Sequence, residues 1–172
     1  MPTTSSDLKL YYSGGNKDGD SITEGYLSLG GYRSSFQISN GVLDNLFDEI
    51  TVQSAYKGFQ DTRCIFIKNM NSSEIMSGLT LWVEGKKDYE LIKFGVSLPT
   101  ANNGYVQKLN TPLELPYGIT FYEAYQEVDK KTLKATLASG ELLALWLRRE
   151  ILTPEELEVD DLTLSQKSNL NL

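Results

Sequence analysis

The stretch that most constrains the fold is Arg63–Asn69, which reads Arg-Cys-Ile-Phe-Ile-Lys-Asn. Its centre is a run of β-branched and aromatic residues, which is typical of a strand rather than a helix. Side chains alternate along a strand, so Cys64 and Phe66 are expected on one face. Ile65 and Ile67 are expected on the other. Because both faces are apolar, the sequence predicts a central strand that is buried on both sides.

Other short segments with strand-like alternation are separated by turn residues. They are Leu8–Tyr12, Ser34–Ile38, Leu79–Glu84, Tyr89–Val96, Ile119–Tyr122, Leu133–Leu137 and Asp161–Gln166. The paired glycines Gly30-Gly31 suit a bulge or a bend at positive φ. About eight to ten strands with frequent turns indicate an all-β protein, a single antiparallel β-sandwich of immunoglobulin-like or jelly-roll type.

The segment Leu142–Arg149 is ambiguous when the residues are taken alone. Leu, Ala and Arg are good helix formers. Gly140 before it and Pro154 after it limit it to about a dozen residues, a length that suits a short helix or a strand. Both alternatives remain open on this evidence.

A chain of 172 residues suits one domain with one sizeable core. We expect a β-sandwich domain over residues 8–166, a polar N-terminal arm over 1–7 and a C-terminal tail over 167–172. Trp82 and Trp146 alternate with apolar neighbours, so both are expected in the core with Cys64 and Phe66.

The composition argues against most catalytic and metal chemistry. The chain has no His and one Cys, so Ser-His-Asp and Cys-His catalysis, His metal ligands and intrachain disulfides are absent. No phosphate-binding glycine motif and no nucleophile-elbow motif occurs. We therefore expect no enzyme activity, no catalytic residues, no cofactor and no metal.

Charge and hydropathy limit the possible partners. The net charge of −7 disfavours nucleic acid. The basic pairs Lys86-Lys87 and Arg148-Arg149 are interpreted as solvated charge. The longest apolar run, Leu142–Leu147, is too short for a membrane helix, and the N-terminus lacks the features of a signal peptide. We expect a protein made in the cytoplasm, without a membrane segment.

Two segments with acidic residues are candidate sites. Asn16–Asp20 begins like a calcium loop, but its glycine is misplaced and Leu27 stands where a Glu is needed. An ordinary polar loop is favoured. Asp44, Asp48 and Glu49 could supply a carboxylate pair for glycoside hydrolysis. Nothing in the sequence fixes such a pair in a cleft, so a solvated turn is favoured.

Aromatic and leucine residues mark possible contact surfaces. Tyr117, Tyr122 and Tyr125 could form a protein interface or stack against a sugar. Leu170 and Leu172 are possible interface anchors in the C-terminal tail. Core and interface roles are favoured over carbohydrate binding.

Several motifs follow one another in a characteristic order. They are Leu8–Tyr12 with Ser13–Asn16, Ser28–Gly31, Asn45–Asp48, Arg63–Asn69, Leu81–Val83, Ala144–Arg149 and Leu162–Leu164. This series resembles a family of small tailed-bacteriophage structural proteins, over about residues 8–166. The chain departs from the family pattern at Lys57–Thr62 and after Pro99, so partner contacts in those loops are not carried over.

The resemblance implies a β fold, with Leu142–Arg149 as a strand, and no catalytic residues. It also implies a place in the virion, in many copies, as a homo-oligomer or bound to the major capsid, portal, neck or tail proteins. The acidic charge suits an exterior position, and polar arms or edge strands could add to neighbours by main-chain pairing. The alternative is a carbohydrate-binding β-sandwich that recognises the host, and an enzyme is the least favoured of the three.

Overall fold

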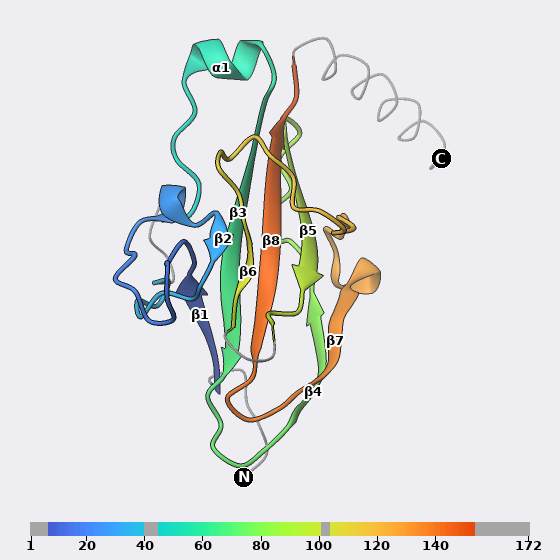
Figure 1. Cartoon of the computed structure of the whole chain (residues 1–172). Helices are drawn as coiled ribbons and strands as arrows, with labels where there is room; N and C mark the ends of the chain where they lie inside the picture. The colour runs from blue at the N-terminus through green and yellow to red at the C-terminus, as the bar shows by residue number, and fades with distance from the viewer. Residues whose placement is uncertain (1–6, 40–44, 101–103, 154–172) are drawn as a thin grey trace, which may run out of the picture.

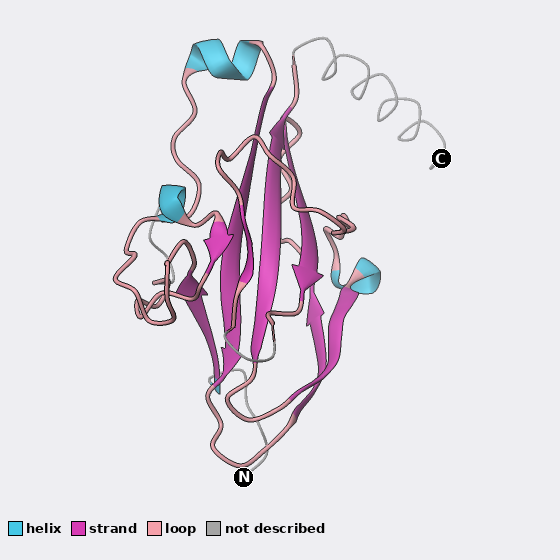
Figure 2. Cartoon of the chain, viewed as in Figure 1, coloured by secondary structure: helices cyan, strands magenta, loops and turns pink. Residues whose placement is uncertain are grey.

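The computed structural model describes residues 7–39, 45–100 and 104–153, and its regular structure consists mostly of antiparallel strands joined by long loops (Figures 1 and 2). The strands are β1 (Leu8–Tyr12), β2 (Gly30–Gly31), β3 (Phe59–Asn69), β4 (Met76–Leu81), β5 (Glu90–Ser97), β6 (Val106–Lys108), β7 (Lys131–Leu137) and β8 (Leu142–Ile151). One short helix, α1 (Val52–Tyr56), and two 3-10 turns, Gly25–Leu27 and Glu127–Asp129, complete the described elements. The predicted all-β, sandwich-like fold is confirmed.

A four-stranded sheet with the order β1-β3-β8-β5 forms the centre of the molecule. In its register Cys64 lies opposite Trp146 and Ile65 lies opposite Leu145. The segment Leu142–Arg149, which local composition left undecided, is therefore part of a strand. It hydrogen-bonds to β3 on one side and β5 on the other, and this pairing overrides the helix propensity of its residues.

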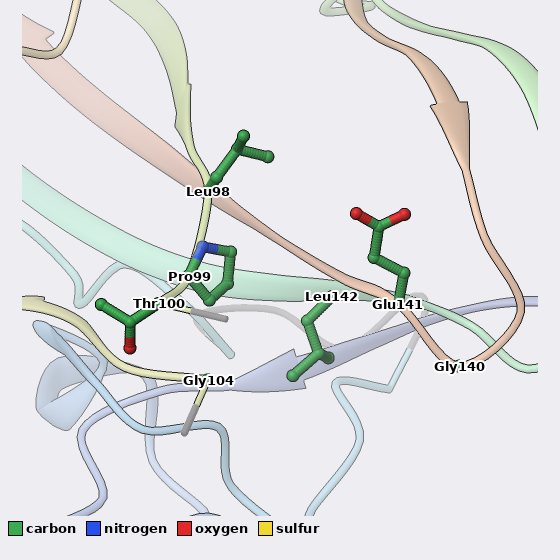
Figure 3. Close-up of a pocket in the computed structure, with 7 residues that line it drawn as sticks. All are labelled: Leu98, Pro99, Thr100, Gly104, Gly140, Glu141 and Leu142. Carbon is green, nitrogen blue, oxygen red and sulfur yellow. The ribbon is translucent and has the colours of Figure 1, made fainter. Parts of the chain in front are cut away.

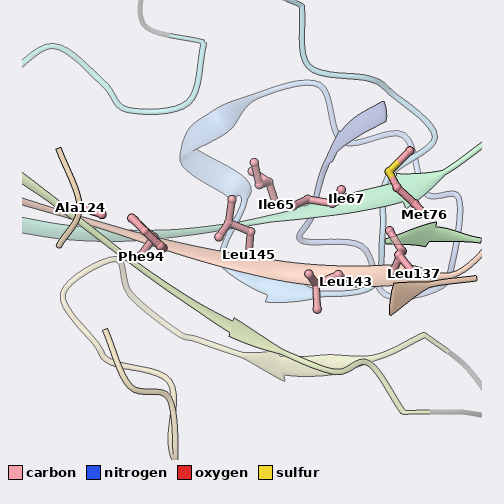
Figure 4. Packing of buried hydrophobic residues seen from close by; sticks show 8 residues of the cluster. All are labelled: Ile65, Ile67, Met76, Phe94, Ala124, Leu137, Leu143 and Leu145. Atoms are coloured by element: carbon pink, nitrogen blue, oxygen red, sulfur yellow. The ribbon is translucent and has the colours of Figure 1, made fainter. Parts of the chain in front are cut away.

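One face of the central sheet packs against the ribbon formed by β4 and β7. Ile65, Ile67, Leu143 and Leu145 project from β3 and β8 into this cluster. Met76 and other apolar residues close it from the opposite side (Figure 4). The remaining buried members are Phe94, Ala124 and Leu137.

The other face is covered by β6 and the loop that follows it. Cys64, Phe66 and Trp146 are fully buried there, packed against Val106 and Leu109. The prediction that Arg63–Asn69 is a central strand with two buried faces is thus confirmed, because a separate cluster lies on each side of β3.

The paired glycines form the bend that was predicted. Gly30 and Gly31 have φ values of 90° and 80°, and the register between β2 and β6 shifts at this point. A Cβ atom on Gly30 would lie 2.0 Å from the carbonyl oxygen of Gln107 and 2.8 Å from the Trp146 ring. The glycine therefore allows β6 to lie close over Trp146.

Other segments pair with parts of both outer edges of the central sheet. The segment 34–38, predicted as a strand, pairs with β1 through the bonds Ser34 N to Tyr12 O (2.8 Å) and Ile38 N to Leu10 O (2.9 Å). It forms isolated bridges rather than a regular strand. On the other edge, Phe94 and Tyr122 exchange two backbone hydrogen bonds of 2.9 and 2.8 Å. Covered edges oppose pairing with other chains at these positions.

The expectations for Trp82 and its strand need correction. β4 begins at Met76 and ends at Leu81, so it lies earlier than the predicted segment Leu79–Glu84. Its pairing with β7 ends at Lys131, which leaves Trp82 beyond the ribbon. Trp82 is only partly buried, at the margin of the first cluster, and its Nε1 donates to Glu84 at 3.2 Å.

Some predicted features lie outside the described residues. They are the arm before Asp7, Asp44, the strand Asp161–Gln166, and the tail with Leu170 and Leu172.

Candidate functional site

The described surface carries an uncharged and mostly apolar hollow above Trp146, here called the Trp146 hollow. Its volume is about 330 Å³. It is lined by Ser97, Leu98, Thr100, Tyr105, Val106, Gln107, Pro116, Tyr117, Ile119 and Trp146. None of these side chains carries a charge, and most of the wall is apolar. Burying such a surface in a partner would therefore be favourable.

Four segments of the chain build the Trp146 hollow. Trp146 of β8 forms the floor, and its Nε1 donates a hydrogen bond of 2.9 Å to the hydroxyl of Ser97, at the end of β5. Val106 of β6 forms a buried part of the wall. The backbone N–H of Tyr117 donates to Gln107 Oε1 at 2.7 Å. This bond fixes the loop that carries Tyr117 to the ribbon.

The rim of the hollow exposes large apolar side chains. Tyr117 is 92% exposed and Leu98 is 66% exposed. Leu113 and Leu115, in the loop leading to Tyr117, are also exposed. Exposed aromatic and leucine side chains beside a fixed hollow are the usual ingredients of a protein interface.

A second hollow adjoins the first and shares Leu98 and Thr100 with it. Its other walls are Pro99 and Gly104 on one side and the 140–142 turn on the other (Figure 3). On the first of these walls, the N–H of Thr100 donates to Tyr105 O at 2.9 Å and the N–H of Gly104 donates to Thr100 O at 3.0 Å. The two hollows thus form one continuous uneven surface beside Leu98.

The three predicted contact tyrosines are not gathered into one platform. Tyr117 lines the Trp146 hollow, whereas Tyr122 pairs through its backbone with the edge of β5. The Tyr125 hydroxyl accepts a hydrogen bond of 2.7 Å from the backbone N–H of Ile92. Burial is the main cause that raises the pKa of Tyr125. Tyr125 therefore supports the fold, and a row of sugar-stacking rings is not formed.

The sequence reasoning missed Leu98, Leu113 and Leu115 as surface residues. A signal was present in the sequence, because each of these leucines lies directly beside a proline. Proline interrupts a central strand, so a leucine beside it has no such strand face on which to be buried.

A second notable feature is a cluster of charges around the buried residues Asp61, Arg63 and Arg149. The interpretation of Arg148-Arg149 as solvated charge was wrong, because the two side chains are only 12% and 8% exposed. Arg149 donates to both carboxylate oxygens of Asp61, and Arg63 lies 3.3 Å from the same carboxylate. Asp48 pairs with Arg63 at 3.1 Å. The ring of Phe47 lies over both guanidinium groups, at 4.7 Å from Arg149 and 5.6 Å from Arg63.

This cluster holds the chain together and offers no reactive group. Burial is the main cause that lowers the pKa of Arg63, and the neighbouring carboxylates oppose that effect. Asp61, Arg63 and Arg149 are buried, whereas the Asp48 side chain is 58% exposed. Pairing with these two carboxylates is what makes the burial of the two arginines tolerable. The Asp48 carboxylate, considered above for glycoside hydrolysis, is occupied by Arg63.

The loop Asn16–Asp20 is a closed turn. The Asp20 carboxylate accepts hydrogen bonds from the backbone N–H groups of Asn16 (2.7 Å) and Lys17 (3.3 Å). Among the residues that the structure describes, no group of three or more Cys, Asp or Glu side chains is placed to hold a metal ion.

In the same described ranges, no helix is both long and apolar enough to cross a membrane. Comparisons with protein-family models, with curated proteins and with solved structures found no match for this chain.

Proposed function

We propose that this chain is a structural, non-catalytic component of a tailed-bacteriophage particle, present in many copies and bound to other virion proteins. It would act as a capsid decoration protein or as part of the neck or tail. The observation that carries the binding role is the Trp146 hollow, with Leu98 and Tyr117 exposed at its rim. The virion setting comes from the ordered resemblance to phage structural proteins.

The positions that carry the resemblance support a shared fold. Cys64, Phe66 and Trp146 are core residues, and Gly30 allows β6 to approach the sheet. Such residues specify packing rather than chemistry. A family related through them is therefore expected to share architecture, with contacts that differ in the loops.

The proposed mechanism of attachment is surface complementarity. Residues 34–38 pair with the β1 edge and Tyr122 pairs with Phe94 on the β5 edge, so main-chain pairing with a neighbour is disfavoured at these positions. Side-chain anchors fit the observed surface better. A few buried aromatic and leucine anchors usually supply most of the binding free energy of an interface.

Quantitative peptide mass spectrometry on purified particles from the native source tests the virion role. A copy number in the hundreds would support a decoration role. A small multiple of six would support a ring in the neck or tail. Absence of the chain from particles would contradict the proposal.

A paired substitution tests whether the Trp146 hollow is the attachment surface. Leu98→Ser with Tyr117→Ser should reduce incorporation into particles by at least about tenfold, because both anchors are lost. Val128→Ser is the matched control, since Val128 is 84% exposed and lies outside the hollow. Equal incorporation of both variants would contradict the role of the hollow.

Carbohydrate binding is the second candidate function. The ring of Tyr117, nearly fully exposed beside Gln107 and Tyr105, is the specific observation in its favour. It predicts that a glycan array gives hits that are lost in Tyr117→Ala. An array without hits, or binding that survives this change, would count against it.

A further inference from the structure

Two lysines lie directly opposite each other near one end of the central sheet. Lys9 of β1 and Lys68 of β3 are register partners, and both are partly buried. The adjacent partners on the same side of the sheet, Tyr11 and Phe66, belong to the cluster that β6 covers. The two lysines, here called the lysine pair, therefore project from that face. Like charges placed opposite each other on neighbouring strands are destabilising.

The carboxylates near the lysine pair are engaged elsewhere. Asp18 pairs with Arg33 at 3.0 Å, and the Arg33 guanidinium lies 4.9 Å from the centre of the Tyr11 ring. The Asp7 carboxylate accepts a hydrogen bond of 3.3 Å from the Asn71 amide. Within the part of the chain that the structure describes, no carboxylate forms an ion pair with either member of the lysine pair. The positive charge of the pair is thus not compensated there.

The most acidic stretch of the sequence is 155–161, which reads Glu-Glu-Leu-Glu-Val-Asp-Asp. It holds five carboxylates and no basic residue, in a chain whose net charge is −7. It begins two residues after Thr153, the last residue that the structure describes. A row of carboxylates can engage both ammonium groups of the lysine pair, whereas a single exposed ion pair contributes little. The stretch and the pair are therefore complementary in charge.

Within one copy, the acidic stretch starts far from the lysine pair. Lys68 lies opposite Leu142, at the beginning of β8, and β8 is 10 residues long, or about 30 Å. The strand ends at Ile151, at the other end of the sheet (Figure 1). From Thr153 to residue 161 the fully extended chain spans at most about 29 Å. A copy can therefore bring at most its last acidic residues toward its own pair, whereas a second copy can bring all five.

We propose that the acidic stretch 155–161 of one copy binds the lysine pair of a neighbouring copy. The inference rests on the proposed function as a component present in many copies, and it names the occupant of the pair. Stretch and pair are different parts of the chain, so each copy can give its stretch to one neighbour and receive that of another. The contact weakens with salt, because the Debye length falls from about 10 Å at 0.1 M to about 3 Å at 1 M.

A peptide-binding measurement tests the site directly. The probe is a fluorescein-labelled peptide of residues 153–162, and its anisotropy is followed as the full chain is added at low salt. Lys9→Gln with Lys68→Gln should weaken binding at least about tenfold, because both charges are lost. Lys86→Gln with Lys131→Gln is the matched control, since it removes the same charge from exposed positions elsewhere. It should change the affinity less than about twofold.

Two further reagents separate charge from packing. Lys9→Arg with Lys68→Arg keeps both charges and should retain binding. A peptide with Gln and Asn in place of Glu and Asp keeps the length and the apolar residues, and it should not bind. Melting of each double variant is measured alongside. Removal of like-charge repulsion predicts that Lys9→Gln with Lys68→Gln melts no lower than the unmodified chain.

Sedimentation velocity tests whether the stretch comes from a second copy. The unmodified chain should associate at low salt and dissociate in about 1 M salt. Lys9→Gln with Lys68→Gln should be monomeric, and so should a chain in which the five acidic residues of 155–161 are replaced by Gln and Asn. An equal mixture of these two variants should form dimers and nothing larger, because one intact stretch and one intact lysine pair remain.

Three outcomes would overturn the inference. They are equal binding of the peptide to the two Lys→Gln double variants, equal binding of the acidic and the neutral peptide, and an unmodified chain that stays monomeric at low salt. Detection of the chain in particles, together with any of these, would reject the contact and keep the virion role. Peptide binding by the lysine pair of a chain that is absent from particles would do the reverse.

Discussion

Arg149 on β8 donates two hydrogen bonds to Asp61 on β3, from Nε to Oδ1 at 2.9 Å and from Nη2 to Oδ2 at 3.0 Å. The two residues are register partners, and both are buried. Bidentate pairs of this kind are among the stronger charge-assisted contacts in proteins. The pair joins the two longest strands at the end of the sheet nearest α1.

Removing the carboxylate should be strongly destabilising. Asp61→Ala leaves Arg149 and Arg63 buried without their shared partner, which is expected to cost about 3–5 kcal/mol of unfolding free energy. Lys130→Ala breaks an exposed ion pair with Glu127 and should cost less than about 1 kcal/mol. Denaturant unfolding followed by tryptophan fluorescence measures both. Similar losses in the two variants would show that the buried pair is not specially important.

Acid should destabilise the fold through two carboxylates. Burial acts to raise the pKa of Glu150, but hydrogen bonds from Lys93 and Arg148 outweigh it, so the pKa lies below the ordinary 4.5. The hydrogen bond from Lys134 lowers the pKa of Glu141 in the same direction. Each group thus contributes stability that is fully present above about pH 4.5 and is lost as the pH falls through the lower folded pKa.

Urea midpoints measured between pH 6 and pH 3 check the acid effect, with about pH 4.5 as the expected onset. Glu150→Gln should reduce the steepness of the loss, because the variant has no proton to take up at this position. The exposed residue Glu127 provides the control, and Glu127→Gln should leave the profile unchanged. If the urea midpoint depended on pH in the same way in both variants, Glu150 would not contribute to the acid effect.

Two glycines with positive φ should respond very differently to alanine. A Cβ on Gly30 meets the backbone of Gln107 and the ring of Trp146, so Gly30→Ala should prevent native packing of β6. Gly78 has φ +65° with no atom within 4 Å of the added Cβ, so Gly78→Ala should cost only about 1–2 kcal/mol of backbone strain. Circular dichroism and thermal melting distinguish a folded from an unfolded variant. A folded Gly30→Ala with near-normal melting would contradict the close packing.

The two tryptophans should differ in their contribution to stability. Trp146→Phe removes buried volume and leaves the Ser97 hydroxyl without its donor, at an expected cost of about 1–3 kcal/mol. Trp82→Phe acts at a partly exposed position and should cost less than about 1 kcal/mol. The same unfolding measurement ranks them. The reverse order would mean that Trp82 is the more important core residue.

The single cysteine should be unreactive in the folded chain. Burial is the main cause that raises the pKa of Cys64, and the side chain is fully enclosed. A thiol reagent should therefore label it only at the rate of unfolding. Ser77→Cys places a thiol at an exposed position of β4 and should react at once. Rapid labelling of the natural cysteine under native conditions would disprove its burial.

The sequence alone determined the character of β3. Side chains alternate between the two faces of a strand, and both faces of β3 carry apolar residues. Such a strand must be covered on both sides, and the structure has that arrangement. The bend at Gly30-Gly31 was equally readable, because glycine is the residue that adopts positive φ without strain. At these two places the local pattern and the tertiary structure agree.

Local pattern was not sufficient where burial depends on the partner strand. Trp82 and Trp146 have similar apolar neighbours, but only Trp146 lies in a strand paired on both sides. Arg148 and Arg149 are adjacent, and both are largely buried because each meets a partner on the sheet. Asp61 lies opposite Arg149 in the register, and Arg148 donates to Glu150 and Gln60. Leu142–Arg149 forms a strand despite its helix propensity, because it pairs with β3 on one side and with β5 on the other.

The Trp146 hollow could be recognised only from the tertiary structure. Leu98, Val106, Tyr117 and Trp146 are separated along the chain, and no sequence pattern links them. They meet because β8 pairs with β5 and because β6 crosses over Trp146 at Gly30. Sequence periodicity fixes which way a side chain points from its own strand. Which distant side chains share a surface depends on strand pairing and packing, which are properties of the whole chain.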